Sequence, residues 1–325
     1  MPDPVTREQY ARLTAGVVLL VAALSGCAAM VPQTMALRDA WPAQVPAKVE
    51  LDSVPFHPQL EYQCGPAALA TTLNHAGVAV TPNDLIPWVY LPARRGSLQV
   101  EMQAAPRRYG SVSYPLAPRF DDLLREVAAG NPVLVLQDNG LGPFSVWHYA
   151  VVVGFDYDAG ELLLRSGANR RRAVPFTVFE YTWKQSGYWA LVTLAPDRIP
   201  ATATEASYLE AVVAMARVAE PDAVITAYTA LLQRWPENLV ASIALANRHH
   251  EQGAFAAAEV VLRRAASHHP DSVVVLNNLA QTVSDQGRSE EALAILDRTE
   301  GVQSPFAAAV GETRAMILRR LGASR

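Results

Sequence analysis

Cys64 has the sequence surroundings of a catalytic thiol. It stands directly before Gly65 and Pro66, and residues 64–76 (CGPAALATTLNHA) predict a helix that begins at the cysteine, with the proline in its first turn. Unpaired N–H groups and the helix dipole favour a thiolate at a helix start, so we expect a lowered pKa for this thiol. Gly65 would leave room for a substrate carbonyl, and the backbone N–H of Cys64 would donate to the developing oxyanion.

His148 is the histidine best placed to serve this thiol as a base. It lies at the start of a predicted strand, residues 146–155 (VWHYAVVVGF), beside Trp147. Gln59 precedes the predicted helix and would offer its side-chain amide as a second oxyanion donor. A cysteine at a helix start with a distant histidine on a strand is the arrangement used in papain-like thiol catalysis.

The elements that must position these residues predict an α+β domain over residues 51–196. The helix at the cysteine and a second, amphipathic helix at residues 120–129 come before a mostly antiparallel sheet. A turn at residues 156–160 joins two of its strands into a hairpin. The strands are expected at residues 132–137, 146–155, 161–165 and 187–194.

Two motifs in this domain resemble those of the bacteriocin-processing, double-glycine-type cysteine peptidases and their papain-like relatives. The first comprises residues 54–56 (VPF), Gln59 and residues 64–69 (CGPAAL). The second, residues 148–156 (HYAVVVGFD), contains the histidine. The resemblance covers residues 51–196 and implies a papain-like fold and a polypeptide substrate.

The resemblance also implies roles for three side chains: Cys64 as nucleophile, His148 as general base and then acid, and Gln59 as oxyanion donor. Ser166 departs from the family pattern, because it stands where an Asp usually follows the histidine strand. The hairpin brings both Ser166 and Asn169 within reach of His148, and either would hold the imidazole by a neutral hydrogen bond. Neither would stabilise imidazolium as a carboxylate does. Two alternatives stay open: a catalytically weak or inactive peptide-binding scaffold, and another acyl transfer by the same pair.

The N-terminus resembles the export signal of a bacterial lipoprotein. Residues 1–26 contain an apolar run at 13–24 that is too short to span a membrane as a helix, and they end in Leu-Ser-Gly before Cys27. This lipobox predicts that Cys27 is lipidated and becomes the first mature residue. Ala28 in place of Asp favours the outer membrane, facing the periplasm; a plain signal peptide cleaved near Ala28 is the alternative. Residues 27–50, rich in Pro and Ala, predict a tether.

Composition excludes several classes of partner and cofactor. The chain has 325 residues, half of them apolar, and a formal net charge of −4, which predicts about two globular domains and no general attraction to nucleic acid. Two cysteines cannot build a disulfide framework or a Cys-rich zinc site, and we expect no cofactor and no metal. If Cys27 is acylated, Cys64 has no disulfide partner. The basic stretch formed by Arg165 and residues 170–172 predicts a solvated edge.

Residues 205–325 predict an all-α region built from repeats. Pro236 and Pro270 are 34 residues apart, as are Gly253 and Gly287, and this is the length of a tetratricopeptide unit. Small residues fit that repeat at its packing positions, although the large aromatic residues expected early in each unit are absent. An ordinary helical bundle is the alternative. The predicted units are residues 205–238, 239–272 and 273–306.

Together these features predict a lipid-anchored protein of the bacterial envelope. Its papain-like domain would be a cysteine peptidase that cleaves a polypeptide through a thioester. The tetratricopeptide-like repeats that follow would recruit the substrate or a partner protein, and the lipid would attach the protein to a membrane.

Overall fold

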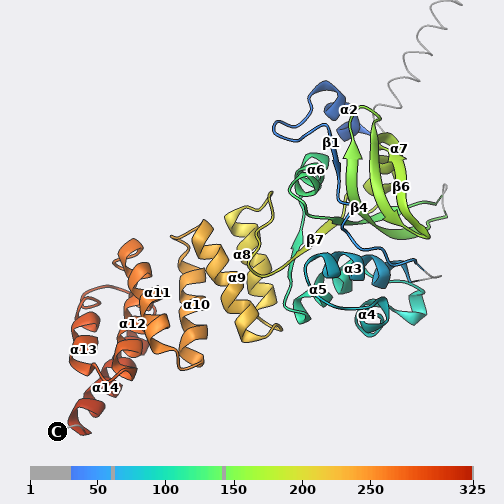
Figure 1. Ribbon diagram of the computed structural model, residues 1–325. Helices are drawn as coiled ribbons and strands as arrows, with labels where there is room; N and C mark the ends of the chain where they lie inside the picture. Colours follow the sequence, from blue (N-terminus) through green and yellow to red (C-terminus); the bar gives the residue numbers. More distant parts are fainter. Residues whose placement is uncertain (1–30, 60–62, 141–143, 324–325) are drawn as a thin grey trace, which may run out of the picture. The chain divides into compact units, whose positions relative to one another are not determined.

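The computed structural model describes residues 31–59, 63–140 and 144–323 (Figure 1). The chain divides into two compact units, of which the first contains the sheet and the second contains the repeat helices. The predicted fold class, an α+β domain followed by an all-α repeat domain, is confirmed. The first unit comprises residues up to 105, 114–193 and 200–202, and the second comprises 106–113, 194–199 and 203 onward.

Seven strands of the described chain form one sheet (Figure 1). Their order along the main path is β2-β7-β3-β4-β5-β6, and β1 pairs with β4. The central strand β4 pairs antiparallel with both β3 and β5, and it places His148 opposite Gln137 of β3. The strands are β1 (Lys48–Glu50), β2 (Val112–Pro115), β3 (Val133–Asp138), β4 (Trp147–Asp156), β5 (Glu161–Ser166), β6 (Asn169–Pro175) and β7 (Ala190–Leu194).

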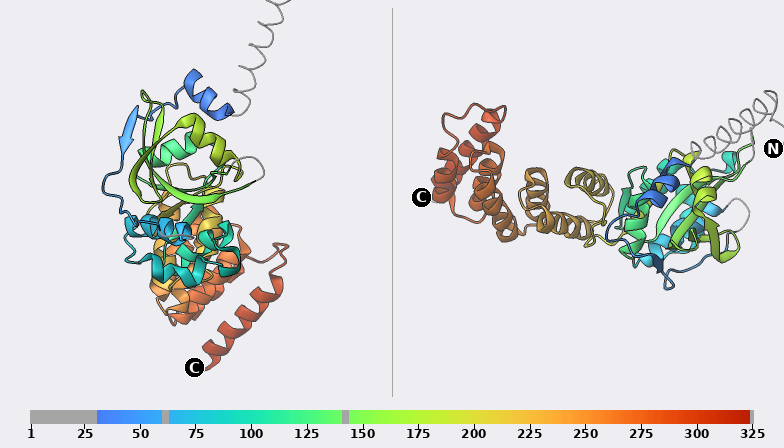
Figure 2. Two further views of the ribbon diagram at one scale, coloured as in Figure 1. Left: turned by 90° about the vertical axis from the view of Figure 1, so that its right-hand side faces the viewer. Right: turned by 90° about the horizontal axis from the view of Figure 1, so that it is seen from above.

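The helices of the first unit gather in two groups around this sheet. Helix α3 packs against β4, and every residue from Gly65 to Leu73 is buried, which explains why this stretch contains no charged residue. Figures 1 and 2 show α3, α4 and α5 side by side, whereas α6 and α7 lie against the sheet. The elements are α2 (Pro32–Asp39), α3 (Cys64–His75), α4 (Pro82–Val89), the 3-10 helix η1 (Pro92–Arg94), α5 (Gln99–Arg108), α6 (Phe120–Ala128) and α7 (Phe176–Lys184).

The predicted tether over residues 27–50 needs correction, because residues 32–50 belong to the folded unit. Helix α2 buries Thr34 and Leu37, and the carboxylate of Glu180 in α7 accepts hydrogen bonds from the backbone N–H groups of Gln33 and Thr34, at 2.9 and 2.5 Å. Strand β1 pairs with β4. An eight-residue helix and a three-residue strand are too short to show a period in the sequence. Cys27 and residues 1–26 lie outside the described residues.

Three helices of this unit escape sequence-based prediction for identifiable reasons. Helix α4 contains Pro87 and helix α5 contains Pro106, and a proline inside a helical pattern normally indicates a break. Helix α7 has the sequence FTVFEYTWK, whose aromatic and β-branched residues favour strands. Packing against the sheet therefore overrides local propensity in α7.

The basic stretch, predicted to form a solvated edge, is only partly exposed. Arg165 lies on β5 with only 3% of its surface exposed, and its guanidinium donates to the backbone carbonyls of Arg170, at 2.5 Å, and Val54, at 3.3 Å. Residues 170–172 are exposed on β6, the edge strand of the main path. The buried arginine therefore connects the hairpin to the chain before α3, and only its neighbours face solvent.

The second unit consists of helix pairs that follow the 34-residue period. Each pair lies within one predicted unit, and Gly253 and Gly287 take positive φ angles of 71° and 83° in the turns between paired helices, where glycine avoids a steric penalty. Ile317 of the last helix is buried in the core of the array. The helices are α8 (Glu205–Met215), α9 (Pro221–Arg234), α10 (Leu239–Glu251), α11 (Phe255–His268), α12 (Val273–Asp285), α13 (Ser289–Asp297) and α14 (Ala307–Ala323).

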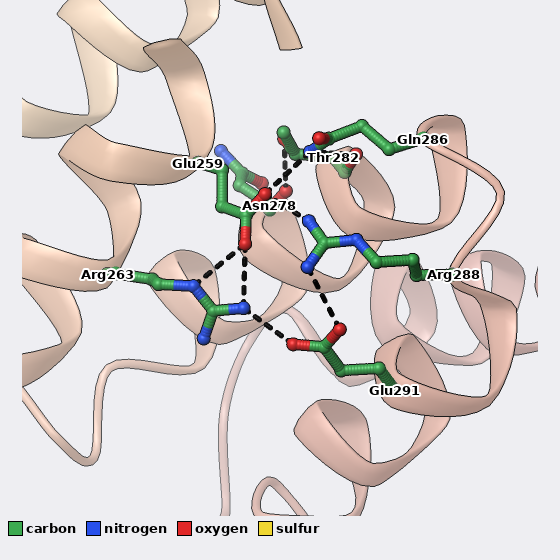
Figure 3. A network of polar contacts seen from close by, with 7 residues as sticks. All are labelled: Glu259, Arg263, Asn278, Thr282, Gln286, Arg288 and Glu291. Atoms are coloured by element: carbon green, nitrogen blue, oxygen red, sulfur yellow. Dashed lines mark hydrogen bonds and ion pairs between the residues drawn. The ribbon is translucent and has the colours of Figure 1, made fainter. Parts of the chain in front are cut away.

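A charged network joins neighbouring repeats (Figure 3). Arg263 of α11 contacts Glu259, at 2.7 Å, and Glu291 of α13, at 2.5 Å. Arg288 contacts the same two glutamates, and Gln286 donates to Glu259 at 2.7 Å. Burial alone would raise the pKa of Glu259, but its hydrogen bonds from Gln286, Arg263 and Arg288 outweigh burial and lower it. The network therefore supports the stacking of the repeats as long as Glu259 is ionised.

None of the described helices is both long enough and apolar enough to cross a membrane. This finding covers residues 31–59, 63–140 and 144–323 and says nothing of the N-terminal segment that carries the predicted lipobox. Attachment through Cys27 therefore stays a prediction.

Candidate active site

Cys64 occupies the first position of α3, as its sequence surroundings predict, and its thiol is free. Gly65 makes a close approach to the segment before α5, since a Cβ atom on this residue would lie 2.3 Å from the Ser97 hydroxyl oxygen. The space beside Gly65 is therefore filled by Ser97, which corrects the expectation that it is open for a substrate carbonyl. The glycine is needed for helix packing beside the thiol.

Burial and backbone donors shift the pKa of the Cys64 thiol in opposite directions. The backbone N–H groups of Tyr149, Gly65 and Cys64 itself lower this pKa, but burial raises it by more, so the pKa lies above its ordinary value. The expectation of a lowered pKa is therefore wrong in direction, because the desolvation of a half-buried sulfur exceeds the effect of the helix start. The contact with Tyr149 also brings the sulfur to the strand that carries His148, the preceding residue.

His148 is held by Ser166, one of the two neighbours that the sequence left open. Its Nε2 atom lies 2.9 Å from the Ser166 hydroxyl oxygen, and Ser166 is only 2% exposed at the end of β5. Asn169 is exposed and pairs with Ser166 across β5 and β6. A register shift between Val152 and Gly154 displaces β5 along β4, which is why counting from the turn could not distinguish the two residues.

The surroundings of His148 favour its neutral form. Burial lowers the pKa of His148, and the nearby positive charge of Arg172 lowers it further. The hydroxyl of Ser166 supplies a hydrogen bond but no negative charge that would oppose this shift. Together with the raised pKa of Cys64, this favours a resting pair of neutral thiol and neutral imidazole over a thiolate–imidazolium pair.

Gln59 lies at the site, and its side chain makes two hydrogen bonds there. Its Nε2 donates to the Tyr149 carbonyl at 3.2 Å, and its Oε1 accepts from the Gly167 N–H at 2.9 Å. Its backbone N–H donates to the Gly167 carbonyl at 3.0 Å. Gln59 therefore connects the histidine strand to the turn after Ser166, and one N–H of its amide is left for a further acceptor.

A cavity of about 940 Å³ contains the three predicted residues Gln59, Cys64 and His148 in its lining. In the described chain no hydrogen bond joins the Cys64 sulfur to the His148 ring, and such contacts are often long before a substrate binds. The lining residues that the sequence did not single out come from the stretch between η1 and the start of α5, from β3, from β4 and the residues just before it, from the turn after β5, and from the segment after α7. They are Arg94, Arg95, Gly96, Ser97, Leu98, Gln99, Leu136, Ser145, Val146, Tyr149, Gly167, Gln185 and Ser186.

Trp147 forms part of this cavity, as its place beside the histidine suggests, and half of its surface is exposed. Tyr149 is a site residue that the sequence did not indicate: its hydroxyl donates to the Ser97 carbonyl at 3.3 Å, and its ring meets Trp189 edge-on. In the sequence, Tyr149 is visible only as a tyrosine next to the histidine, within a stretch that predicts a strand.

The described residues offer no metal site, since no three His, Cys, Asp or Glu side chains gather within them as ligands would. The polar groups of the cavity are a thiol, an imidazole, a hydroxyl and amides, and these suit nucleophilic acyl chemistry by the protein's own side chains.

Comparison with known proteins finds two separate matches, one in the sheet-containing part of the chain and one in the helical repeats. Residues 51–191 match the model of the Peptidase C39-like family, and residues 249–304 match a tetratricopeptide repeat model. Among solved structures, the crystal structure of a candidate C39-like peptidase from Bacillus anthracis is 21% identical, with a TM-score of 0.39, and covers 46% of this chain and 98% of its own. No curated protein matches the chain.

Proposed function

We propose that this chain, which carries a Peptidase C39-like domain followed by tetratricopeptide repeats, is a thiol peptidase that hydrolyses a polypeptide. One observation carries the proposal: the Cys64 sulfur contacts the backbone of Tyr149, next to His148, and thiol and imidazole line one cavity. The hydrogen bond between His148 Nε2 and Ser166 supports it further, because it leaves Nδ1 to exchange a proton with the thiol.

In the proposed reaction, His148 takes the proton of the Cys64 thiol as the sulfur attacks the carbonyl carbon of the scissile bond. The backbone N–H of Cys64 and the remaining amide N–H of Gln59 donate to the oxyanion. His148 then gives the proton to the leaving amine, and a thioester stays on Cys64. A water molecule, deprotonated by His148, attacks the thioester, the thiol leaves with that proton, and the new carboxylic acid is released.

A cleavage assay on the full chain tests this proposal. A library of internally quenched peptides is expected to be cut by the native protein, but not by the Cys64→Ala or His148→Ala variants. The control variant His75→Gln changes a histidine that contacts the Gly130 carbonyl and does not line the cavity, and it should keep full activity. Binding of the peptides without cleavage by the native protein would refute the peptidase and favour a peptide-binding scaffold.

The scaffold is the second candidate function, and Ser166 is the observation that favours it. A carboxylate in this position would stabilise imidazolium in the transition state, whereas a hydroxyl stabilises it less. Acyl transfer to an acceptor other than water is a third outcome of the same chemistry. Mass spectrometry of the products with added amines distinguishes it from hydrolysis.

Attachment to a membrane through a lipid on Cys27 is proposed from the sequence motif and its place before α2. Because α2 begins at Pro32 and Glu180 binds its first turn, the chain from Cys27 to α2 spans at most about 18 Å even when fully extended. The peptidase domain would then work close to the membrane surface. Cys27→Ala should release the protein from membranes, and continued sedimentation with membranes would contradict the proposal.

The repeats are proposed to recruit a protein, either the substrate or a partner. A tetratricopeptide array presents helix faces over several stacked units, a surface suited to another polypeptide. Deleting residues from 203 onward should leave the cleavage of short peptides intact and reduce the cleavage of a natural protein substrate. An equal loss on both substrates would contradict recruitment.

A further inference from the structure

Ser97 contacts both of the elements that carry the proposed nucleophile and base. On one side, its side chain lies against Gly65 of α3, the residue after Cys64. A Cβ atom on this glycine would lie 2.3 Å from the Ser97 hydroxyl oxygen and 2.7 Å from the Ser97 Cβ. On the other side, the Ser97 carbonyl accepts a hydrogen bond at 3.3 Å from the hydroxyl of Tyr149, the residue after His148 on β4. One residue therefore touches the immediate neighbours of the thiol and of the imidazole.

The backbone around Ser97 is fixed on both sides. The carbonyl of the preceding residue, Gly96, accepts a hydrogen bond from the Leu91 N–H at 2.8 Å, within an isolated antiparallel bridge. The carbonyl of the following residue, Leu98, accepts from the N–H of Met102 at 3.1 Å, in the first turn of α5. Met102 is itself fully buried. Ser97 therefore cannot move away from α3 and β4 without disturbing the start of α5.

Tyr149 connects Ser97 to the other groups of the site. Its backbone N–H donates to the Cys64 sulfur, and its carbonyl accepts from Gln59 Nε2 at 3.2 Å. Only 2% of its surface is exposed, and its ring meets Trp189 edge-on with the ring centroids 5.7 Å apart. Burial raises the pKa of the Tyr149 hydroxyl, so this hydroxyl stays a hydrogen-bond donor at neutral pH.

The thiol and the imidazole stand on separate elements, so the packing of α3 against β4 determines how far apart they lie. Proton transfer between two heavy atoms needs them within about 2.6–3.2 Å when the substrate is bound. A displacement of about 1 Å in such a pair can cost about a hundredfold in rate. Contacts beside the two residues therefore affect the reaction even where they do not touch the substrate.

We propose that Ser97 is a positioning residue that sets the separation between Cys64 and His148. Its side chain limits how closely α3 approaches, and its carbonyl holds β4 in place through the hydroxyl of Tyr149. The proposal rests on the proposed peptidase function and adds two residues to its machinery, Ser97 and Tyr149, which act through their neighbours.

The test measures how much His148 accelerates the alkylation of Cys64 by iodoacetamide at neutral pH. The alkylation rate of the full chain is followed by mass spectrometry with His148 present and in His148→Ala, and the ratio of the two rates is the contribution of the histidine. Because each ratio compares proteins that differ only at His148, a change in access to the thiol cancels. The ratio needs no peptide substrate, so it tests positioning separately from cleavage.

Tyr149→Phe should lower this ratio about fivefold, because it keeps the ring and the backbone contacts and removes only the hydrogen bond to Ser97. A bond of 3.3 Å is long for a hydroxyl donor, so we expect a moderate effect. Tyr208→Phe is the matched control. Tyr208 is a buried tyrosine of the repeats whose hydroxyl donates to the Arg198 carbonyl at 3.2 Å, and its substitution should leave the ratio unchanged.

Gly65→Ala tests the same residue from the side of α3. Gly65 has no positive φ angle, so alanine adds only a methyl group, which would overlap the Ser97 side chain and displace it. The ratio should fall about fivefold or more. Ser97→Gly opens the contact and should also lower the ratio. In the double variant Gly65→Ala, Ser97→Gly, the new methyl group takes the place of the serine side chain, so most of the native ratio should return.

Three results would overturn the positioning role: an unchanged ratio in Tyr149→Phe, an equal fall in Tyr149→Phe and Tyr208→Phe, or no recovery in the double variant. Each of these leaves the peptidase function standing. A ratio of one in the native protein would mean that His148 does not act on the thiol, and the peptidase function and the positioning role would then fail together. If peptides are cut, kcat should fall with the ratio in Tyr149→Phe, whereas KM should change less.

Discussion

The two regions of this molecule hold their titratable side chains in opposite ways. In the repeats, Arg263, Arg288 and Arg314 each contact two carboxylates, so their charge is compensated within the stack. At the candidate active site, His148 is held by the Ser166 hydroxyl, and the positive charge of Arg172 lowers its pKa together with burial. Paired charges stabilise the stack of repeats, whereas the surroundings of Cys64 and His148 favour a neutral thiol and a neutral imidazole.

The uncharged partner of His148 also affects the protonation state of the Cys64 thiol. A carboxylate near His148 would favour imidazolium and with it the thiolate, but the side chain there is Ser166, and Arg172 adds a positive charge. The site therefore starts as a neutral pair, and charge develops only as the thiol attacks a substrate. Three substitutions test this difference between the two regions.

The largest effect is expected from His148→Ala in the cavity. Without a base, a thiol whose pKa is raised by burial stays protonated, so kcat/KM should fall by about a thousandfold. Steady-state kinetics on the best peptide measure the loss, and circular dichroism checks that the fold is retained. A loss below about tenfold would mean that His148 is not the base.

Ser166→Asp would place a carboxylate beside His148, as the repeats have carboxylates beside their arginines. The carboxylate would face His148 Nε2, raise the pKa of the histidine and favour the thiolate, so alkylation of Cys64 by iodoacetamide at neutral pH should accelerate about tenfold. The acid limb of the pH–rate profile should move to higher pH, because His148 would then be protonated at a higher pH than in the native protein. Ser166→Asn, which adds no charge, is the control, and equal acceleration by it would contradict the electrostatic account.

The smallest effect is expected from Glu259→Gln in the repeats, which leaves Arg263 and Arg288 with only Glu291 in common. The free energy of unfolding should fall by about 1 kcal/mol, as urea denaturation of the full chain would measure. Glu259 has a lower pKa folded than unfolded, so its contribution is present above the unfolded pKa and is lost as pH falls through the folded value. The difference between native and variant proteins should therefore vanish in acid. A difference that persists there would contradict the ionic origin.

Much of this structure follows from local sequence signals. The helix at Cys64, the strand at His148 and the 34-residue repeat are each visible as a short pattern or a spacing. The outcome for Ser166 and Asn169 needed three-dimensional information, because a register shift between Val152 and Gly154 makes counting from the hairpin turn ambiguous.

Other features depend on contacts between distant segments and were beyond sequence reasoning. The loop of Arg94 and Arg95 reaches the site only because α4 and α5 fold beside α3, and both helices contain a proline. The direction of the pKa shift at Cys64 depends on how deeply tertiary packing buries the sulfur, which a helix-start pattern does not reveal.

The most direct test of the central claim is to trap the thioester on Cys64. The full chain is mixed with its best peptide, quenched in acid within milliseconds to seconds, and digested for mass spectrometry. The account predicts an acyl group of the N-terminal product on the peptide that contains Cys64, decaying as the carboxylic acid appears and missing in His148→Ala. Cleavage products without any adduct on Cys64, or peptide binding with neither adduct nor products, would contradict it.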